Sequence, residues 1–321
     1  MKKIITASLF SLIFIGLFLC GESANQEENP WDWPLEKVRV LVDEVRAGKD
    51  LTPKTWPGGT KVAVALSFDF DAETNDLRDK NISPGLFSQG EYAARVAIPR
   101  ILSLLDKYDI PASFFVPAVT GLLHSDEIKA IVAKKRHEIG MHGWIHERNS
   151  LLGEEDERRL MRQSYESLKK MTGKAPSGIR TPSWDFSRAT LKLIRELGLL
   201  YDSSLMADDR PYEILQEGRP TGVVELPVEW LLDDYPYFGF SRYASIRPHL
   251  KPADVFEIWA AEFDKAYEEG TLFLLTMHPK YIGHRSRITM LEKLIQYMKE
   301  HEKVWFATHE DIARYVLKGI E

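Results

Sequence analysis

KVAVALSFDFD, residues 61–71, is an apolar run that ends in two aspartates. Its alternating pattern, rich in Val and Phe, predicts a buried β-strand. The period of two places Asp69 and Asp71 on the same face, about 7 Å apart along the strand. Because two carboxylates that leave an apolar strand together are costly to bury unpaired, we expect a cationic group beside them. A solvated strand end, where Asp is common, is the alternative interpretation.

Beyond this strand, short apolar segments alternate with longer helical ones, which predicts parallel βα units in an α/β barrel or an open doubly wound sheet. The barrel is favoured because polar candidate residues follow several different strands, where barrel enzymes build their active sites. No glycine-rich phosphate loop follows the first strand, which argues against a nucleotide-binding fold. Further strands are predicted at 112–117, 138–141, 178–181, 199–202, 223–228, 271–277 and 304–307, and helices at 91–108, 125–136, 154–171, 187–197, 252–269 and 287–301.

The length of 321 residues suits one large domain or two small ones. Apolar residues make up 44% and charged residues 28%, which predicts a folded core. The net charge of −6 argues against a nucleic-acid-binding protein, which usually carries a basic face. We predict a signal peptide at 1–23, an N-terminal arm rich in Trp and Pro at 24–57 with a helix near 35–46, and a main domain at 58–321.

The first residues predict export. Lys2 and Lys3 precede an uncharged run over 4–20, and small residues follow, with cleavage expected near Ser23 or Ala24. The protein would then be secreted or periplasmic, without a membrane span in its mature form. A retained anchor is the alternative, although the run is slightly shorter than the roughly 20 residues of a spanning helix. Cys20 is the only cysteine, so in a cleaved chain any metal would be held by His, Asp or Glu.

His142 and His146 follow the strand predicted at 138–141. Two histidines four residues apart can bind one ion, as in other His-x-x-x-His zinc sites. With one Asp they form a 2-His-1-carboxylate set that leaves positions open for water and substrate. Two unrelated surface histidines are the alternative interpretation.

Two more candidates follow later strands. Arg180 opens the segment Arg180-Thr181-Pro182 and could orient a carboxylate through a bidentate bond, or else be a surface charge. His278 ends Leu275-Thr276-Met277-His278 after the most apolar strand, where it is well placed for general acid–base chemistry. A satisfied core or rim histidine is the alternative for His278.

These segments, in this order, resemble the motifs of the polysaccharide deacetylases of carbohydrate esterase family four, the NodB-homology group. The resemblance covers roughly residues 61 to 315. It implies an irregular (β/α)7-type barrel and a divalent metal, usually zinc. It also implies a hydrolase that removes N-acetyl groups from a polysaccharide containing N-acetylglucosamine, such as peptidoglycan or a chitin-like glycan. Whether the chain forms a homo-oligomer stays open.

The resemblance also implies roles for individual residues. Asp69 matches the general base, and Arg180 the arginine that orients it. His278 matches the general acid. The positions that match the metal ligands are Asp71, His142 and His146.

The chain departs from the commonest family pattern. Phe70 separates the two aspartates, and Ser183-Trp184 replaces the aromatic-Gly pair that usually follows Arg-x-Pro, which leaves the oxyanion donor open. The departures are similar to a branch that includes peptidoglycan deacetylases and allantoinase-like hydrolases of cyclic amides. By that similarity, four residues are expected to line the substrate cleft, although ordinary packing would also explain them: Glu91, Trp184, Trp230 and Asp234.

Other functions stay open at this point. A hydrolase of small cyclic amides would use nearly the same residues, but export suits a glycan better. A non-catalytic glycan-binding module would not need Asp69, Arg180 and His278 together. A non-haem iron oxygenase could use the same ligand trio.

Overall fold

The computed structural model describes residues 29–240 and 249–319. The predicted signal peptide, its cleavage site and Cys20 therefore lie outside the described residues. The chain divides into two compact units, one ending at Leu41 and the other running from Val42 to Glu321. In the first, a 3-10 helix (Pro30–Asp32) precedes the start of α1 (Leu35–Val42). No helix within 29–240 and 249–319 combines the length and apolar character needed to span a membrane.

The second unit is built around β2 (Val62–Asp69), the strand predicted from residues 61–71. β2 pairs in parallel along most of its length with β9 (Leu272–Met277). On its other side, β10 (Val304–Phe306) pairs with its first half and β3 (Ser113–Val116) with its end, both in parallel. The parallel strands that follow β3 in spatial order are β4 (Glu138–Met141), β5 (Gly178–Ile179), β6 (Tyr201–Asp202) and β8 (Arg219–Glu225).

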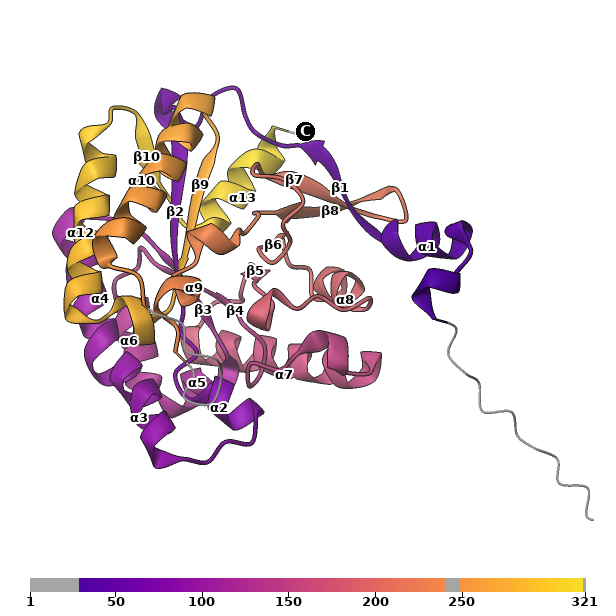
Figure 1. Ribbon diagram of the computed structural model, residues 1–321, viewed down its shortest axis with the longest axis horizontal. Helices are drawn as coiled ribbons and strands as arrows, with labels where there is room; N and C mark the ends of the chain where they lie inside the picture. Colours follow the sequence, from indigo (N-terminus) through magenta and orange to yellow (C-terminus); the bar gives the residue numbers. More distant parts are fainter. Residues whose placement is uncertain (1–28, 241–248, 320–321) are drawn as a thin grey trace, which may run out of the picture. The chain divides into compact units, whose positions relative to one another are not determined.

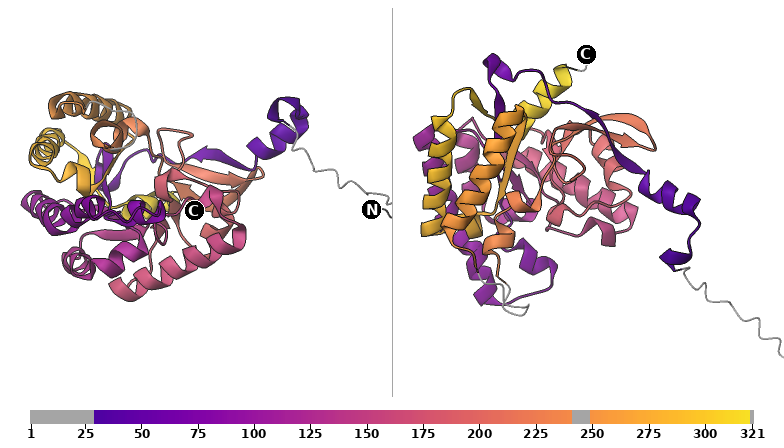
Figure 2. Two further views of the ribbon diagram at one scale, coloured as in Figure 1. Left: turned by 60° about the horizontal axis from the view of Figure 1, so that its bottom comes forward. Right: turned by 45° about the horizontal axis from the view of Figure 1, so that its top comes forward.

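Two antiparallel strands close the far edge of this sheet. β7 (Tyr212–Gln216) pairs with β8, and β1 (Val45–Asp50) pairs with β7. After β8, a single parallel bridge from Asp233 to Thr276 joins the chain to β9. The sheet therefore curls into a partly closed barrel, as the views in Figures 1 and 2 show, and the predicted α/β architecture is confirmed.

The helices connect successive strands, and the long ones lie on the outside of the curled sheet (Figures 1 and 2). α10 packs against β9, and α7 against β4. Apart from short 3-10 turns, the helices among the described residues of this unit are α2 (Thr74–Arg78), α3 (Pro84–Tyr92), a π-helical turn (Ala93–Ala97), α4 (Ile98–Tyr108), α5 (Ala118–Leu123), α6 (Ser125–Ala133), α7 (Glu154–Thr172), α8 (Thr190–Glu196), α9 (Tyr235–Phe238), α10 (Pro252–Glu269), α11 (Pro279–Ile282), α12 (Arg285–Glu300) and α13 (His309–Lys318).

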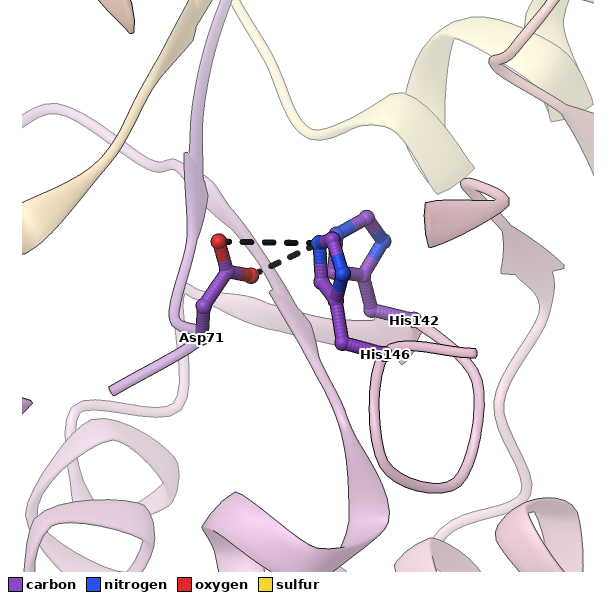
Figure 3. Close-up of side chains that lie close together, drawn as sticks. All are labelled: Asp71, His142 and His146. Atoms are coloured by element: carbon purple, nitrogen blue, oxygen red, sulfur yellow. Dashed lines mark ion pairs between the residues drawn. The ribbon is translucent and has the colours of Figure 1, made fainter. Parts of the chain in front are cut away.

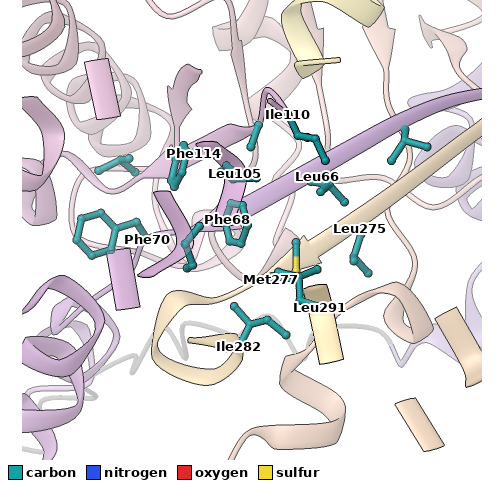
Figure 4. Close-up of a cluster of buried hydrophobic side chains, with 14 of the residues drawn as sticks. Leu66, Phe68, Phe70, Leu105, Ile110, Phe114, Leu275, Met277, Ile282 and Leu291 are labelled. Atoms are coloured by element: carbon teal, nitrogen blue, oxygen red, sulfur yellow. The ribbon is translucent and has the colours of Figure 1, made fainter. Parts of the chain in front are cut away.

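The alternation within β2 divides its side chains between two layers. Val62, Val64, Leu66 and Phe68 belong to the large apolar core beneath the outer helices, part of which is drawn in Figure 4. The intervening Ala63 and Ala65 belong to a second, inner cluster. Ser67 and Asp69 continue this inner row toward the end of the strand, where both are buried. The period of two therefore places the first predicted carboxylate inside the barrel.

α13 contributes to that inner cluster through Ile312, Ala313 and Val316. It starts at a capping box, in which Thr308 accepts a hydrogen bond from the Asp311 N–H and Asp311 accepts one from the Thr308 N–H. The box fixes the position of the first helical residue, His309, which is fully buried.

Some elements differ from the predictions. The helix predicted at 91–108 begins at Pro84 and contains the π-helical turn Ala93–Ala97. The helix predicted at 187–197 begins at Thr190, because the Ser187 hydroxyl accepts the N–H groups of Ala189 and Thr190 in a turn that precedes it. The β7–β8 hairpin was not predicted, although its loop residues Glu217 and Gly218 have the positive φ values of a tight hairpin turn.

Candidate active site

The carboxyl ends of β2, β4, β5 and β9 and the loops after them border a cavity of about 440 Å³. Parallel strands place the residues that follow them at one edge of the sheet, which is why segments far apart in the sequence meet here. The predicted residues that line the cavity are Asp69, Asp71, His142, His146, Trp184, Trp230 and His278.

Asp69 and Arg180 form a buried ion pair. The Asp69 Oδ1 atom accepts a hydrogen bond of 2.7 Å from Arg180 Nη1, and both side chains are almost fully excluded from solvent. Burial alone would raise the pKa of Asp69, but the positive charge of Arg180, with a smaller effect from His278, outweighs burial and lowers it. Asp69 is therefore ionised near neutral pH, as a proton acceptor must be.

Next to the Asp69–Arg180 ion pair, the structure brings together three side chains, those of Asp71, His142 and His146 (Figure 3). One ligand atom from each lies within 4.8 Å of the others. His142 Nε2 is 3.4 Å from Asp71 Oδ1, and His146 Nε2 is 3.7 Å from Asp71 Oδ2. The structure therefore brings together the three predicted metal ligands.

The loop between the two histidines is held by Glu147. Its carboxylate accepts the backbone N–H groups of Trp144 and Ile145. At Gly143, φ is +74°, and a Cβ there would lie 2.8 Å from Pro182 Cγ, so only glycine fits this turn. The fixed loop explains why a spacing of four residues directs both imidazoles at Asp71.

The residues present fit a divalent cation. Asp71 Oδ1 is buried and has no hydrogen-bond partner among the described residues. His142 Nδ1 is 2.7 Å from the Arg180 carbonyl oxygen, so Nδ1 carries the proton and the Nε2 lone pair faces the carboxylates of Asp69 and Asp71. Asp71 Oδ1 therefore has no donor in the described part of the chain, and it faces the lone pair of His142 Nε2. A cation between these two atoms would interact favourably with both.

His146 is held differently, by a residue that the sequence did not reveal. Arg78 Nη1 lies 2.8 Å from His146 Nδ1. An arginine only donates hydrogen bonds, so Nδ1 accepts and a neutral His146 carries its proton on Nε2, the atom that faces Asp71. Metal-bound histidines usually donate from the second nitrogen, so His146 can bind a cation through Nε2 once Arg78 releases Nδ1.

Arg78→Met is therefore expected to strengthen zinc binding about 10-fold or more, because His146 can then place its proton on Nδ1. Competition with a chromophoric chelator measures the dissociation constant. Arg148→Met is the matched control, since Arg148 lines the same cavity without a bond to His146. Equal gains in both variants would mean that positive charge near the site, and not the hydrogen bond to Nδ1, limits affinity.

His278 also lies near Asp71, with its Nε2 atom 3.9 Å from Asp71 Oδ2. Its Nδ1 and its backbone N–H lie 2.7 and 3.0 Å from Asp234 Oδ1, and Asp233 is 3.5 Å from Nδ1. Burial alone would lower the pKa of His278, but Asp233, Asp234 and Asp71 raise it to about 10. His278 is therefore a protonated imidazole, able to give up a proton.

Aromatic side chains form another wall of the cavity. The rings of Trp184 and Trp230 lie 4.2 Å apart between centroids, and Tyr235, Phe240 and Tyr281 also line the cavity. Ser183 and Trp184 have positive φ values of 56° and 55°. Consecutive left-handed non-glycine residues are strained and concentrate at functional sites.

The structure corrects two of the cleft predictions. Glu91 is on the exposed face of α3, 3.7 Å from Arg95 one turn later, whereas Leu86 and Gln89 of the same helix line the cavity. Asp234 is fully buried behind His278 and does not line the cavity, because both its short bonds turn its carboxylate toward that histidine. The neighbouring residue Asp233 lines the cavity in place of Asp234.

With this geometry established, comparison with known proteins identifies the family. Residues 61–201 match the profile of the family described as polysaccharide deacetylase. A peptidoglycan deacetylase of Helicobacter pylori is 33% identical over 289 residues, which cover 80% of this chain and 97% of that protein. The chain belongs to the polysaccharide deacetylase family.

Comparison with solved structures supports the assignment to the polysaccharide deacetylases. A candidate polysaccharide deacetylase from Mycobacterium smegmatis is 35% identical, with a TM-score of 0.78, over 86% of this chain and 96% of that one. An allantoinase is 28% identical, with a TM-score of 0.70, over 84% of this chain and 97% of that one. The predictions of a polysaccharide deacetylase and of its irregular (β/α)7-type barrel are thus confirmed.

Proposed function

We propose that this polysaccharide deacetylase is an exported, metal-dependent hydrolase that removes N-acetyl groups from N-acetylglucosamine units of peptidoglycan or a chitin-like glycan. One observation carries the proposal. An ionised base, Asp69 paired with Arg180, and a protonated acid, His278, line one cavity together with Asp71, His142 and His146. The 33% identity to a peptidoglycan deacetylase favours peptidoglycan as the first substrate to test.

In this scheme Asp71, His142 and His146 would hold a divalent cation, of which zinc suits the two imidazoles and one carboxylate. When bound, such a cation polarises the amide carbonyl and lowers the pKa of a nearby water. Asp69 takes a proton from the attacking water, and Arg180 keeps the carboxylate ionised and oriented. The water oxygen then forms a bond to the carbonyl carbon.

The same residues complete the reaction. We assign the Ser183 backbone N–H as a donor to the developing oxyanion, because Ser183 lines the cavity in its left-handed turn. His278 gives its proton to the nitrogen as the carbon–nitrogen bond breaks, and Asp234 orients the imidazole through Nδ1. The products are acetate and a free amino sugar. Trp184 and Trp230 line the cavity, and in this proposal they would stack on the sugar ring.

Hydrolysis of a cyclic amide is the second candidate, and one observation favours it. The allantoinase resembles this chain with a TM-score of 0.70 over nearly its whole length. The same base and acid would open a ring instead of releasing acetate. The apolar segment at 4–20, which Lys2 and Lys3 precede, favours the glycan, because it fits an exported protein.

Acetate release distinguishes these candidates. Purified protein is given peptidoglycan, acetylated chitooligosaccharides or allantoin, with and without a chelator, and with zinc added back. Release of acetate that the chelator abolishes and zinc restores is the expected result. Ring opening of allantoin without acetate release from either glycan would replace the proposal with the second candidate.

The acid role of His278 predicts a shift in pH dependence. His278 donates a proton only below its own pKa, so activity falls as pH rises through that value. Asp234→Asn removes a negative charge that raises the pKa, and we expect the alkaline limb of kcat/KM to move down by about 1–3 pH units. Asp79→Asn, in the same cavity but without contact to His278, should leave the limb in place. An unmoved limb in Asp234→Asn would exclude His278 as the titrating acid.

A further inference from the structure

Arg180 is surrounded by acceptors that account for every hydrogen it can donate. A guanidinium has five N–H donors. Nη1 donates to Asp69 Oδ1 at 2.7 Å and to Ser67 Oγ at 2.9 Å, and Nε donates to the Ser203 carbonyl oxygen at 3.1 Å. Nη2 donates to Ser203 Oγ at 3.0 Å and to His309 Nε2 at 3.2 Å. Four of the five bonds thus set the plane in which the fifth reaches Asp69.

His309 differs from the other acceptors because its role depends on one tautomer. Arg180 can only donate, so His309 Nε2 must accept, and the ring proton must lie on Nδ1. Nδ1 is 3.0 Å from Ser113 Oγ, which also accepts the His309 backbone N–H at 2.9 Å. Ser113 in turn donates to Glu138 Oε2 at 2.8 Å. Together these bonds allow only one placement of the hydrogens, with the ring proton of His309 on Nδ1 and the hydroxyl hydrogen of Ser113 directed at Glu138.

The surroundings exclude the charged form of His309. The ring is fully buried, edge-on to Phe115 at 5.0 Å between centroids. The Arg180 guanidinium stacks over the same Phe115 ring at 4.2 Å. Burial first, and then the positive charge of Arg180, lower the pKa of His309 far below its ordinary value. His309 therefore remains an acceptor for Arg180.

We propose that His309 is a positioning residue for the reaction: it holds Arg180 Nη2 from inside the barrel and so fixes the guanidinium against Asp69. His309 does not line the cavity, so it acts through Arg180 and not on substrate. The capping box at Thr308 and Asp311 holds His309 at the start of α13. The last helix of the described chain thereby supports a base located on β2, which comes much earlier in the sequence.

The test compares His309→Leu, which removes the acceptor, with His309→Gln, whose amide can accept from Arg180 and donate to Ser113. The expected effect on the deacetylation rate rests on the proposed function. The rate is therefore measured together with an NMR signal of Arg180 that needs no substrate. The signals are those of the Arg180 guanidinium N–H groups in a 15N–1H spectrum, and they are assigned by their absence from the spectrum of Arg180→Lys. His301→Leu is the matched control, since His301 packs among Phe263, Tyr267 and Tyr297 away from Arg180.

In His309→Leu we expect kcat to fall about 10- to 100-fold with KM nearly unchanged, because a misaligned base slows the chemical step and not binding. The Arg180 N–H signals, which we expect to exchange slowly in the wild type because all five donors are buried and bonded, should broaden or disappear. His309→Gln should recover most of kcat and the Arg180 signals, and His301→Leu should match the wild type.

Equal losses in the Leu and Gln variants, or intact Arg180 signals in His309→Leu, would overturn the proposal. If His309→Leu does not fold, Ser113→Ala replaces it: loss of the Nδ1 partner should weaken the Arg180 signals, and unchanged signals would again overturn the proposal. Wild-type protein that is inactive on every glycan would refute the proposed function, while the spectra would still decide the role of His309.

Discussion

Asp69→Asn is expected to lower kcat about 10²- to 10⁴-fold, the range that general-base catalysis contributes. The amide has the shape of the carboxylate but cannot take the proton of the attacking water. Zinc binding should persist, since Asp71, His142 and His146 are unchanged. Acetate release under saturating substrate measures the loss, and a chelator competition measures the retained metal.

The control for this experiment is Asp264→Asn, the same substitution at an exposed carboxylate that accepts a hydrogen bond from Tyr297. It should keep wild-type kcat. Full activity in Asp69→Asn would show that another group takes the proton. Loss of zinc together with kcat would instead assign Asp69 to the metal site, which its 3.7 Å distance to His142 Nε2 makes a meaningful alternative.

Arg180→Leu is expected to lower the free energy of unfolding by about 3–5 kcal/mol at pH 7, because it removes the hydrogen-bonded counter-charge of the buried Asp69 carboxylate. Urea unfolding measures the change. Adding Asp69→Asn should restore part of the loss, since no charge is then left unpaired, so the two substitutions should be strongly non-additive. Additive losses would mean that packing of the long side chain, and not the ion pair, supplies the stability.

The pH dependence of this stability has a definite sign. The pKa of Asp69 is lowered in the folded protein, so the pair stabilises the fold above the unfolded-state pKa of about 3.9 and loses its effect as pH falls through the folded-state value. The difference between wild type and Arg180→Leu should therefore shrink in acid. The matched control is the exposed pair Arg159 and Asp156 at 2.9 Å, for which the same cycle should give only about 0.2–1 kcal/mol.

Much of the site was predictable because it depends on short-range patterns. The period-two alternation of residues 61–71 indicated a strand whose inner face ends in Asp69. The spacing of His142 and His146 indicated two imidazoles directed at one point. Thr308 and Asp311 have the spacing of a capping box, and α13 begins there. Each of these signals lies within one turn or one strand, so no tertiary contact is needed to read it.

The wrong and missing predictions have one cause: sequence periodicity does not show which residues, distant in the sequence, a side chain or strand contacts in the folded protein. Glu91 was expected in the cleft, but its helix turns it toward solvent and Arg95. Asp234 was expected beside substrate, but 44 residues of chain separate it from the His278 that it orients. The β7–β8 hairpin joins the sheet because β8 pairs with β6, and its other strand, β7, pairs with β1, which lies more than a hundred residues earlier.

By itself, the sequence determined the α/β class, the family motifs in their order, and the residue types able to hold a cation, accept a proton and donate one. Only the tertiary structure decided how those groups are supported. Arg78 meets His146 across 68 residues, and Arg180 meets His309 across 129. The reason is physical: a buried donor or acceptor must find its partner wherever the fold places one, and that partner has no fixed spacing along the chain.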